Sequence, residues 1–200
     1  MSKRDNSRVT RALSGSQEAY QRLLEEYQRP VFSIIVRMVR DAGLAEDLTQ
    51  ETFLKAFRSL DSFDQSRKFS SWLFSIAHNT TIDHVRRKQL PTVSLDSAGD
   101  SEDGAGLAFL AVAPDASPEE ALTHHDLAAA LERALAGLRP EYAEVLVLRF
   151  QQEMSYEEIS GVTGLVLGTV KTHIYRARKE LAAALESAGW DPGAHAGSRR

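Results

Sequence analysis

The chain has 200 residues, of which 42% are hydrophobic, and a formal net charge of -4; this suits one sizeable domain or two small ones with helical cores. It has no cysteine, which excludes disulfides, thiolate zinc sites and cysteine nucleophiles. No apolar run approaches the length of a membrane span, and the opening MSKRDNSRVTRALSG lacks the apolar core of a secretory signal. We therefore expect a cytoplasmic protein.

The charge is concentrated in one segment. Residues 1–90 hold 15 Lys+Arg and 11 Asp+Glu. Residues 91–120 hold no Lys or Arg and 7 Asp+Glu, and residues 121–200 hold 9 Lys+Arg and 10 Asp+Glu. Nonspecific DNA affinity comes from neutralising phosphates, so a chain balanced in this way should bind free DNA weakly. It is expected to need a partner.

Strand signals are nearly absent, and the first 90 residues predict helices. Residues 1–15 are expected to form a flexible basic arm. The predicted helices are about Ser16–Tyr27 with Ser16 as a cap, Pro30 to about Arg40, the segment AGLAEDLTQETFLKAFRSL, and Ser70 to about Lys88. The stretch DSFDQSRKFS between the last two is expected to be a loop.

Residues 91–120 read PTVSLDSAGDSEDGAGLAFLAVAPDASPEE, a segment rich in Ser, Gly, Ala, Pro and Asp without sustained periodicity. This composition predicts a flexible acidic linker. A flexible chain of 30 residues spans about 30 Å on average and much more when pulled straight, so two domains can sit far apart on one partner.

After the linker, leucines at helical spacing predict one helix, and Pro140 opens the next; the leucines are Leu127, Leu131, Leu135 and Leu138. In the stretch MSYEEISGVTG, Ser155 and Glu158 form a capping-box pattern at the start of a short helix. Gly164 is the expected left-handed residue that closes this helix. Residues 187–200 are expected to be a flexible tail.

A second helix follows Gly164, with two distinct faces. The inward stripe consists of Val170, Ile174, Ala177 and Leu181. The outward ridge consists of Thr169, Thr172, His173 and Arg176, flanked by Lys171, Arg178 and Lys179. A helix, a glycine turn and a second helix with a polar ridge form the helix-turn-helix arrangement, whose second helix fits the major groove. An ordinary amphipathic helix with a solvated charged face is the competing interpretation.

Two blocks of the sequence resemble one family. EDLTQETFLKAFRSLDSFDQSRKFSSWLFSIAHNTTIDHVRRK resembles region 2 of bacterial RNA polymerase sigma factors, and LRPEYAEVLVLRFQQEMSYEEISGVTGLVLGTVKTHIYRARKEL resembles region 4. No conventional region 3 separates them, which is the layout of the extracytoplasmic-function (ECF) group of the sigma-70 family. The resemblance implies an all-α protein of two small helical domains, with region 2 at residues 16–90 and region 4 at residues 121–186.

In region 2 the resemblance implies two surfaces. The AEDLTQETF helix is similar to the surface that docks on the clamp coiled coil of core polymerase, so the core contacts would be Asp47, Gln50, Glu51 and Phe53. Without the family, Asp47 and Glu51 would be a solvated face and Phe53 a core residue. The residues implied for the minus-ten element and the melted strand are Lys68, Trp72, Asn79, Arg86 and Arg87, which offer a flat face, an amide and cations. Phe63, Phe69 and Leu73 are expected to pack in the core.

In region 4 the ridge resembles the reader of the minus-thirty-five element. Its implied contacts are Thr169, Lys171, Thr172, His173, Arg176 and Arg178, with Arg176 on a guanine and Lys171 and Arg178 on phosphates. Two departures bear on this. His173 stands where relatives commonly carry arginine, and Val166 and Leu167 stand where a small capping residue or proline is frequent.

The resemblance implies a sigma factor that binds core RNA polymerase, through the clamp coiled coil and flap of the polymerase, and promoter DNA, both duplex and melted. No cofactor, metal or catalytic activity is expected, and an anti-sigma factor is a further candidate partner. A stand-alone helix-turn-helix regulator is the alternative; it would bind duplex DNA tightly by itself. An enzyme with His124 and His125 as metal ligands is disfavoured, because adjacent histidines point in different directions and no carboxylate pair at ligand spacing accompanies them.

Overall fold

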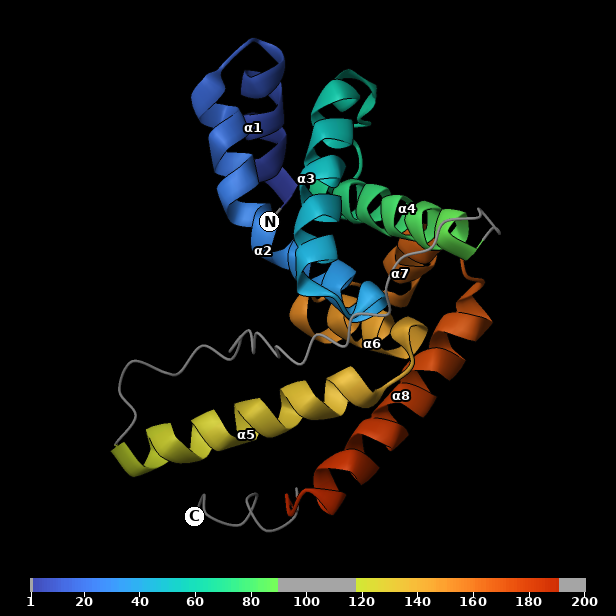
Figure 1. Cartoon of the computed structure of the whole chain (residues 1–200). Coiled ribbons are helices and arrows are strands. Elements are labelled where there is room, and N and C mark those ends of the chain that lie inside the picture. The colour runs from blue at the N-terminus through green and yellow to red at the C-terminus, as the bar shows by residue number, and fades with distance from the viewer. Residues whose placement is uncertain (1, 90–117, 191–200) are drawn as a thin grey trace.

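The computed structural model describes residues 2–89 and 118–190, and every regular element in these two ranges is helical (Figure 1). The elements are α1 (Ser2–Leu13), α2 (Gln17–Val39), α3 (Ala42–Arg58), the 3-10 turn η1 (Leu60–Ser62), α4 (Phe69–Gln89), α5 (Pro118–Gly137), α6 (Pro140–Leu146), the π-helical turn η2 (Val147–Gln151), α7 (Tyr156–Thr163) and α8 (Leu167–Ser187). The all-α prediction is confirmed. Most of the expected linker, residues 91–117, lies outside the described residues, as do residues 191–200 and the side chains of His124 and His125. The last three residues assigned to the linker begin α5.

The expectation of a flexible arm at residues 1–15 is wrong, because residues 2–13 form α1, which packs along α2. Val9 and Ala12, three positions apart on one face, are buried in the main core. Asp5 is 2% exposed, and one of its carboxylate oxygens accepts a hydrogen bond of 2.9 Å from the hydroxyl of Tyr27. Two apolar residues and one buried polar contact therefore help to dock a helix whose other positions are mostly charged or polar.

The predicted break before Pro30 is also wrong, since α2 is one helix with Pro30 in its interior. Proline lacks the N–H group that would bond the carbonyl of Glu26, and this costs about 3 kcal/mol or more. However, Val31 and Ile34, just after Pro30, are fully buried, and burial of each aliphatic side chain contributes roughly 1.5–3 kcal/mol. Packing of this stretch thus outweighs the missing hydrogen bond.

The predicted caps are confirmed. The Ser16 hydroxyl accepts from the backbone N–H of Ala19, at the start of α2. Ser155 and Glu158 form a reciprocal capping box at the start of α7. Gly164 closes α7 with a φ of 71°, in the left-handed region where a side chain would be strained. The turn between α7 and α8 is therefore fixed by local chemistry.

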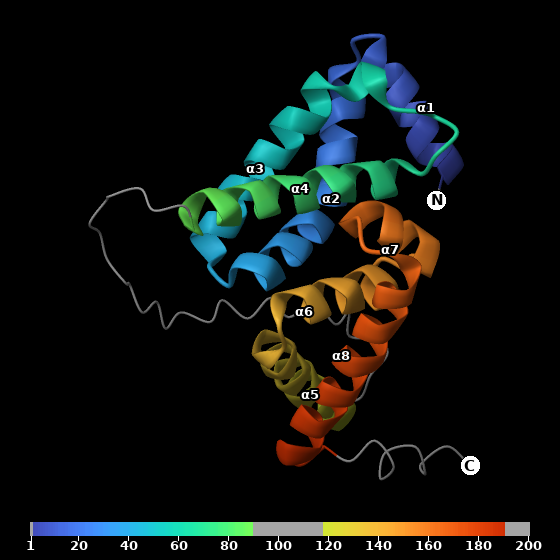
Figure 2. The same cartoon turned by 90° about the vertical axis from the view of Figure 1, so that its right-hand side faces the viewer.

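The largest apolar cluster joins the two halves of the chain. Within the first four helices, the ring of Tyr27 contacts Phe69 and Phe74 edge-on, at centroid distances of 5.4 and 6.2 Å. Buried side chains of η2, α7 and α8 belong to the same cluster. Accordingly α6 packs on α2 and α7 packs on α4, so that α6 and α7 lie between the first four helices and the α5–α8 pair (Figures 1 and 2).

Candidate polymerase and promoter interfaces

The outer face of α8 carries most of the predicted ridge. Lys171, Thr172, Arg176 and Arg178 are exposed, and Thr169 is half-buried. The opposite stripe packs inward, since Val170, Ile174 and Ala177 are at most 3% exposed. The helical period alone predicts which of these positions are exposed and which are buried, and the structure agrees at these residues; their role in DNA binding stays a prediction.

His173 does not lie on the ridge as expected. Its ring packs edge-on against Tyr142 of α6, with the ring centroids 5.1 Å apart. Its Nδ1 atom is buried and has no hydrogen-bond partner. The position falls between the inward and outward faces of α8, and the aromatic ring of Tyr142 draws the imidazole inward. A half-buried histidine in contact with α6 has a smaller reach towards DNA than an exposed arginine would have.

The start of α8 lacks a side-chain cap, as the sequence indicated. Val166 occupies the N-cap position without a capping hydrogen bond, and it is 72% exposed. Its carbonyl accepts from the backbone N–H groups of Thr169 and Val170, which begins the helix by main-chain bonding alone. The first turn of α8 is thus formed at residues 167–170 in spite of the unusual cap.

Residues predicted to hold the melted strand form a stripe along α4. Trp72, Asn79 and Arg86 recur every seven residues, a spacing that drifts by only about 20° per repeat on an α-helix. Asn79 and Arg86 are exposed and Trp72 is half-buried. The stripe from Trp72 to Arg86 is about 21 Å long at 1.5 Å per residue. Exposed Arg87 extends the positive end of the helix.

The ring of Trp72 packs against two aromatic neighbours. Phe63 lies 5.2 Å and Phe69 5.7 Å from it between ring centroids. Phe63 and Phe69 are themselves buried, as is Leu73, so the prediction that these three pack in the core is confirmed. Trp72 therefore packs against two aromatic rings while part of its surface stays open to solvent, as a stacking platform requires.

Lys68, the cation of the loop before α4, is already paired. Its ammonium group lies 2.7 Å from Oε1 of Glu158 in α7. The two side chains are 53% and 22% exposed. Lys68 and Glu158 also line a cavity of about 460 Å³ between the loop, α4 and α7, together with Trp72 and Ser75. Sequence reasoning missed this contact, because nothing in the spacing connects residues 90 positions apart.

The α3 surface differs from the prediction at one position. Asp47 and Gln50 are exposed, and Glu51 is half-exposed and bonded to Lys55 at 2.7 Å. Phe53, however, is 4% exposed and packs against Phe57 with a centroid distance of 5.7 Å. It is a core residue, as its apolar character alone would indicate.

Leu54 takes the exposed apolar position that Phe53 was expected to hold. It is 56% exposed. It follows Asp47, Gln50 and Glu51 by seven, four and three residues, so the four share one helical face. The sequence already contains this spacing, which could have predicted that Leu54 lies on the same face as the three polar residues. A groove of about 610 Å³ runs beside this face between α2 and α3, lined by Arg29, Phe32, Glu46 and Gln50 among others.

Comparison with known proteins identifies the family to which the chain belongs. Residues 23–90 match Sigma-70 region 2, and residues 128–181 match Sigma-70, region 4. The ECF RNA polymerase sigma factor SigW of Bacillus subtilis is 34% identical over 87% of this chain and 92% of that protein. The chain belongs to the ECF sigma factors of the sigma-70 family. The RNA polymerase sigma-H factor of Pseudomonas aeruginosa is 35% identical over 91% of this sigma factor and 94% of that protein.

Solved structures share the fold. The structure of CnrH in complex with the cytosolic domain of CnrY aligns with a TM-score of 0.59 at 26% identity, covering 92% of this sigma factor and 97% of that chain. The sigma factor RpoE of Bartonella quintana, in complex with the anti-sigma factor NepR, aligns with a TM-score of 0.59 at 22% identity over 84% of this chain and 96% of that one. The second likeness concerns the fold alone.

Membership in this family decides between the alternatives. A sigma factor is a transcription initiation factor without enzymatic activity, and it acts with core RNA polymerase on promoter DNA. The stand-alone regulator is not favoured, because a region 2 match precedes the helix-turn-helix. In residues 2–89 and 118–190, no helix has the length and apolar character needed to cross a membrane.

Proposed function

We propose that this sigma factor captures the melted minus-ten strand along α4 and reads the minus-thirty-five element with α8. Residues 16–90, with α1 added, and residues 121–186 would act as the two domains. The observation that supports this best is the single stripe formed by Trp72, Asn79 and Arg86. At about 3.4 Å per stacked base, the stripe is long enough for about six bases.

Each member of the stripe has a distinct role in this proposal. Trp72 offers a ring face to an unpaired base, and stacking of this kind is worth about 1–3 kcal/mol per base. Asn79 offers an amide to an exposed base edge. Lys68, Arg86 and Arg87 neutralise backbone phosphates. Because captured bases supply the free energy of opening, the reaction requires no nucleotide hydrolysis by the sigma factor.

On α8, Arg176 is the proposed base reader, since its guanidinium can bond both major-groove acceptors of a guanine. Lys171 and Arg178 are proposed to contact phosphates on the two sides of the ridge. Thr172 donates its hydroxyl hydrogen to the carbonyl of Gly168 at 2.9 Å, so its oxygen remains available as an acceptor. Thr169 and His173 are half-buried, and we assign them to the edge of the contact.

Core polymerase is proposed to dock on the face of α3 formed by Asp47, Gln50, Glu51 and Leu54. An apolar residue surrounded by acidic and amide groups suits a contact with the basic and apolar side chains of a coiled coil. A second contact, with the flap, is proposed at the apolar groove of about 360 Å³ between α5, η2 and α8, beside Phe150, which is 58% exposed.

Two further statements belong to the proposal. The protein is inferred to act in the cytoplasm, where core polymerase and the chromosome are found. An anti-sigma factor is a candidate inhibitor, an idea supported by the structure of CnrH, which is held in complex with a second protein, the cytosolic domain of CnrY.

A reconstituted reaction tests the proposed function. Core polymerase and the chain together are expected to open genomic promoter fragments, whereas the chain alone should bind them weakly and without sequence preference. Trp72→Ala should reduce opening and leave core binding intact, and Arg87→Ala should weaken strand capture. Arg22→Ala is the matched control, because Arg22 is also an exposed arginine of the first domain but lies on α2, away from both proposed contact faces. Tight and specific binding without melting by the isolated chain would favour the stand-alone regulator.

A further inference from the structure

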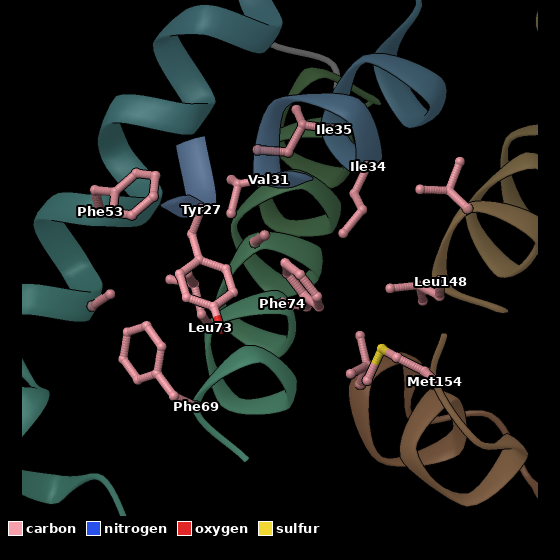
Figure 3. Close-up of a cluster of buried hydrophobic side chains, with 14 of the residues drawn as sticks. Tyr27, Val31, Ile34, Ile35, Phe53, Phe69, Leu73, Phe74, Leu148 and Met154 are labelled. Atoms are coloured by element: carbon pink, nitrogen blue, oxygen red, sulfur yellow. The ribbon is translucent and has the colours of Figure 1, made fainter. Parts of the chain in front are cut away.

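Two tyrosines are buried in the described residues, and their surroundings differ. Tyr27 lies in the main cluster, with its ring among apolar side chains such as Phe74 (Figure 3). Tyr142 is 4% exposed and belongs to the smaller cluster that joins α5, α6 and α8. Its ring also contacts two basic side chains: the imidazole of His173 meets it edge-on, and the guanidinium carbon of Arg139 lies 5.8 Å from its centroid.

Tyr142 is a fixed support for His173. Because the tyrosine is buried in its cluster, its ring cannot turn freely with a neighbour. The imidazole centroid lies 5.1 Å from the tyrosine centroid, with the ring planes at 66°. Edge-on contacts between aromatic rings are favourable, so this contact favours one orientation of the imidazole. A side chain that is ordered before DNA binds loses little conformational entropy on binding.

The two nitrogens of the imidazole are not equivalent in this orientation. Nδ1 of His173 is buried and has no hydrogen-bond partner among the described residues. In its neutral form an imidazole carries one hydrogen, on either nitrogen. A hydrogen on Nδ1 would be a buried donor without an acceptor, and such groups are rarer than unsatisfied acceptors. The hydrogen therefore belongs on Nε2, and the half-buried ring can present a single donor to an approaching molecule.

The position of His173 on α8 places this donor at the edge of the DNA-reading ridge. His173 precedes Arg176 by three residues, which corresponds to about 4.5 Å along the helix axis. Stacked base pairs are about 3.4 Å apart, so the two side chains would meet neighbouring base pairs with α8 in the major groove. Arg176 is exposed and extends into the groove, whereas His173 rests against α6 and stays nearer the groove wall.

The chemistry of a single donor restricts the bases that it can read. Adenine and guanine both present N7 as an acceptor in the major groove, and N7 lies nearer the backbone than O6 of guanine does. Cytosine presents only the donor of its amino group, and thymine carries a methyl group beside its O4 acceptor. One N–H group near the groove wall therefore fits a purine N7. It cannot distinguish the two purines, because their major-groove edges differ only at position 6 of the ring.

We propose that His173 reads one base of the minus-thirty-five element as a purine, through a hydrogen bond from Nε2 to N7, and accepts adenine and guanine alike. Tyr142 is the positioning residue that holds the imidazole for this contact. The inference rests on the proposed function of α8, because it requires this helix in the major groove. It adds to that function one promoter position where either purine is accepted and the pyrimidines are disfavoured.

Promoter duplexes with 7-deazapurines test this contact, since these bases pair normally and lack the N7 acceptor. Holoenzyme, formed from core polymerase and the full chain, is titrated with duplexes that carry each natural base or a 7-deazapurine at each position of the minus-thirty-five element. At one position the holoenzyme should bind adenine and guanine equally, within about twofold. The 7-deazapurine there should weaken binding by about two- to tenfold, as expected for the loss of one hydrogen bond.

Three substitutions at His173 separate the donor from the ring. His173→Gln places an amide N–H at about the reach of Nε2 and should keep the sensitivity to 7-deazapurines. His173→Phe keeps an aromatic ring against Tyr142 but has no donor, so it should bind natural and 7-deazapurine duplexes equally at this position. His173→Arg supplies two donors, and it should favour guanine over adenine by about fivefold or more, because N7 and O6 of guanine both accept.

The proposal is overturned if His173→Phe stays as sensitive to 7-deazapurines as the native chain at every position. A native chain that distinguishes adenine from guanine at the position where His173→Phe loses its sensitivity overturns it too. Arg176→Ala, titrated with the same duplexes, tests the proposed function separately. Loss of its own guanine preference, with no effect of the His173 substitutions, rejects only the purine contact. Unchanged base preference in both Arg176→Ala and His173→Phe instead counts against α8 as the reader.

Discussion

The ammonium group of Lys68 lies 2.7 Å from Oε1 of Glu158, which joins the loop before α4 to the first turn of α7. Glu158 also accepts from the backbone N–H of Ser155 in the capping box. Burial raises the pKa of this carboxyl, but the hydrogen bonds from Lys68 and Ser155 together outweigh burial and lower the pKa below its ordinary value. The carboxylate is thus held ionised beside a cation that the proposed function assigns to DNA.

Replacing Glu158 by Gln should release Lys68 while preserving the helix. The amide oxygen of glutamine can still accept from the Ser155 N–H, so the cap survives. A partly exposed ion pair is worth about 0–1 kcal/mol, and the free chain should therefore bind a single-stranded minus-ten oligonucleotide up to about fivefold more tightly. Titration at several salt concentrations measures this, with Glu141→Gln as the control, because Glu141 is an exposed carboxylate of α6 outside the cavity that Lys68 lines. Equal affinities for Glu158→Gln and the native chain would mean that the pair does not mask Lys68.

The buried pair between Asp5 and Tyr27 should give a pH-dependent stability. Burial, the largest influence, raises the pKa of Asp5 above its usual 3.8, so the folded state disfavours the charged carboxylate. This destabilisation is complete above the folded-state pKa and fades as pH falls through it. Asp5→Asn removes the charge and keeps an acceptor for the Tyr27 hydroxyl. It should raise the free energy of unfolding at pH 7.5, by an amount that shrinks as pH falls towards 4.

Chemical denaturation at a series of pH values measures that difference. Asp61→Asn is the control, since Asp61 is an exposed carboxylate in the same domain. Asp5→Ala should behave in the opposite way to Asp5→Asn, because an unpaired buried hydroxyl costs about 1–3 kcal/mol. A constant stability gain for Asp5→Asn across the pH series would show that charge burial is not the cause.

Local chemistry explains which parts of the fold could be predicted from the sequence. Caps at Ser16 and Ser155, the glycine turn at Gly164 and the buried stripe of α8 all depend on residues within a few positions of one another. The uninterrupted course of α2 through Pro30 and the docking of α1 depend on tertiary burial, which overrides a local break signal and stabilises a weakly apolar segment.

The candidate site shows the same division. The stripe on α4 follows from a seven-residue spacing, and the exposed ridge of α8 follows from a charged helical face. The inward turn of His173 depends on Tyr142, and the masking of Lys68 depends on Glu158. These are contacts between helices far apart in the chain, and no pattern within either helix encodes them.

The ridge of α8 should contain two kinds of contact that mutation can separate. Arg176→Ala, if Arg176 bonds a guanine edge, should cost about 1–3 kcal/mol and flatten the preference at one position of the minus-thirty-five element. Lys171→Ala, if Lys171 meets a phosphate, should weaken all sequences alike and reduce the salt slope by about one. Holoenzyme binding to single-base promoter variants at several salt concentrations distinguishes them. If Arg176→Ala keeps the base preference of the native chain, Arg176 does not read the minus-thirty-five element.

Core docking should depend on the apolar centre of the α3 face as well as on its charges. Reversing the charge of Asp47 and Glu51 together should weaken association with core polymerase. Leu54→Ala should do so too. Docking would bury the leucine side chain, and the smaller alanine should reduce the binding free energy by roughly 1–3 kcal/mol. Phe53→Leu changes a buried side chain behind this face, and it should leave the affinity for core polymerase unchanged. Unaltered affinity of Leu54→Ala in a pull-down titration would place the interface elsewhere.

Helix α1 should position the loop that precedes α4, although it lies outside the residues that match region 2. The amide nitrogen of Asn6 donates to the backbone carbonyl of Gln65 at 2.7 Å. The hydroxyl of Thr10 donates to the carbonyl of Asn6 at 2.9 Å and lies 3.3 Å from the side-chain oxygen of Gln65. The loop backbone three residues before Lys68 is thereby tied to α1.

Asn6→Ala should therefore loosen the loop and reduce discrimination among bases of the minus-ten element. A single hydrogen bond contributes about 0.5–1.5 kcal/mol, so holoenzyme binding to fork templates with single-base changes should lose about two- to tenfold of its preference. Ser7→Ala is the control, because Ser7 is exposed on the same helix. If α1 only stabilises the fold, Asn6→Ala should lower the unfolding midpoint and leave base preference intact. Loss of preference without loss of core binding separates the two roles, since the proposed α3 docking face includes neither Asn6 nor Gln65.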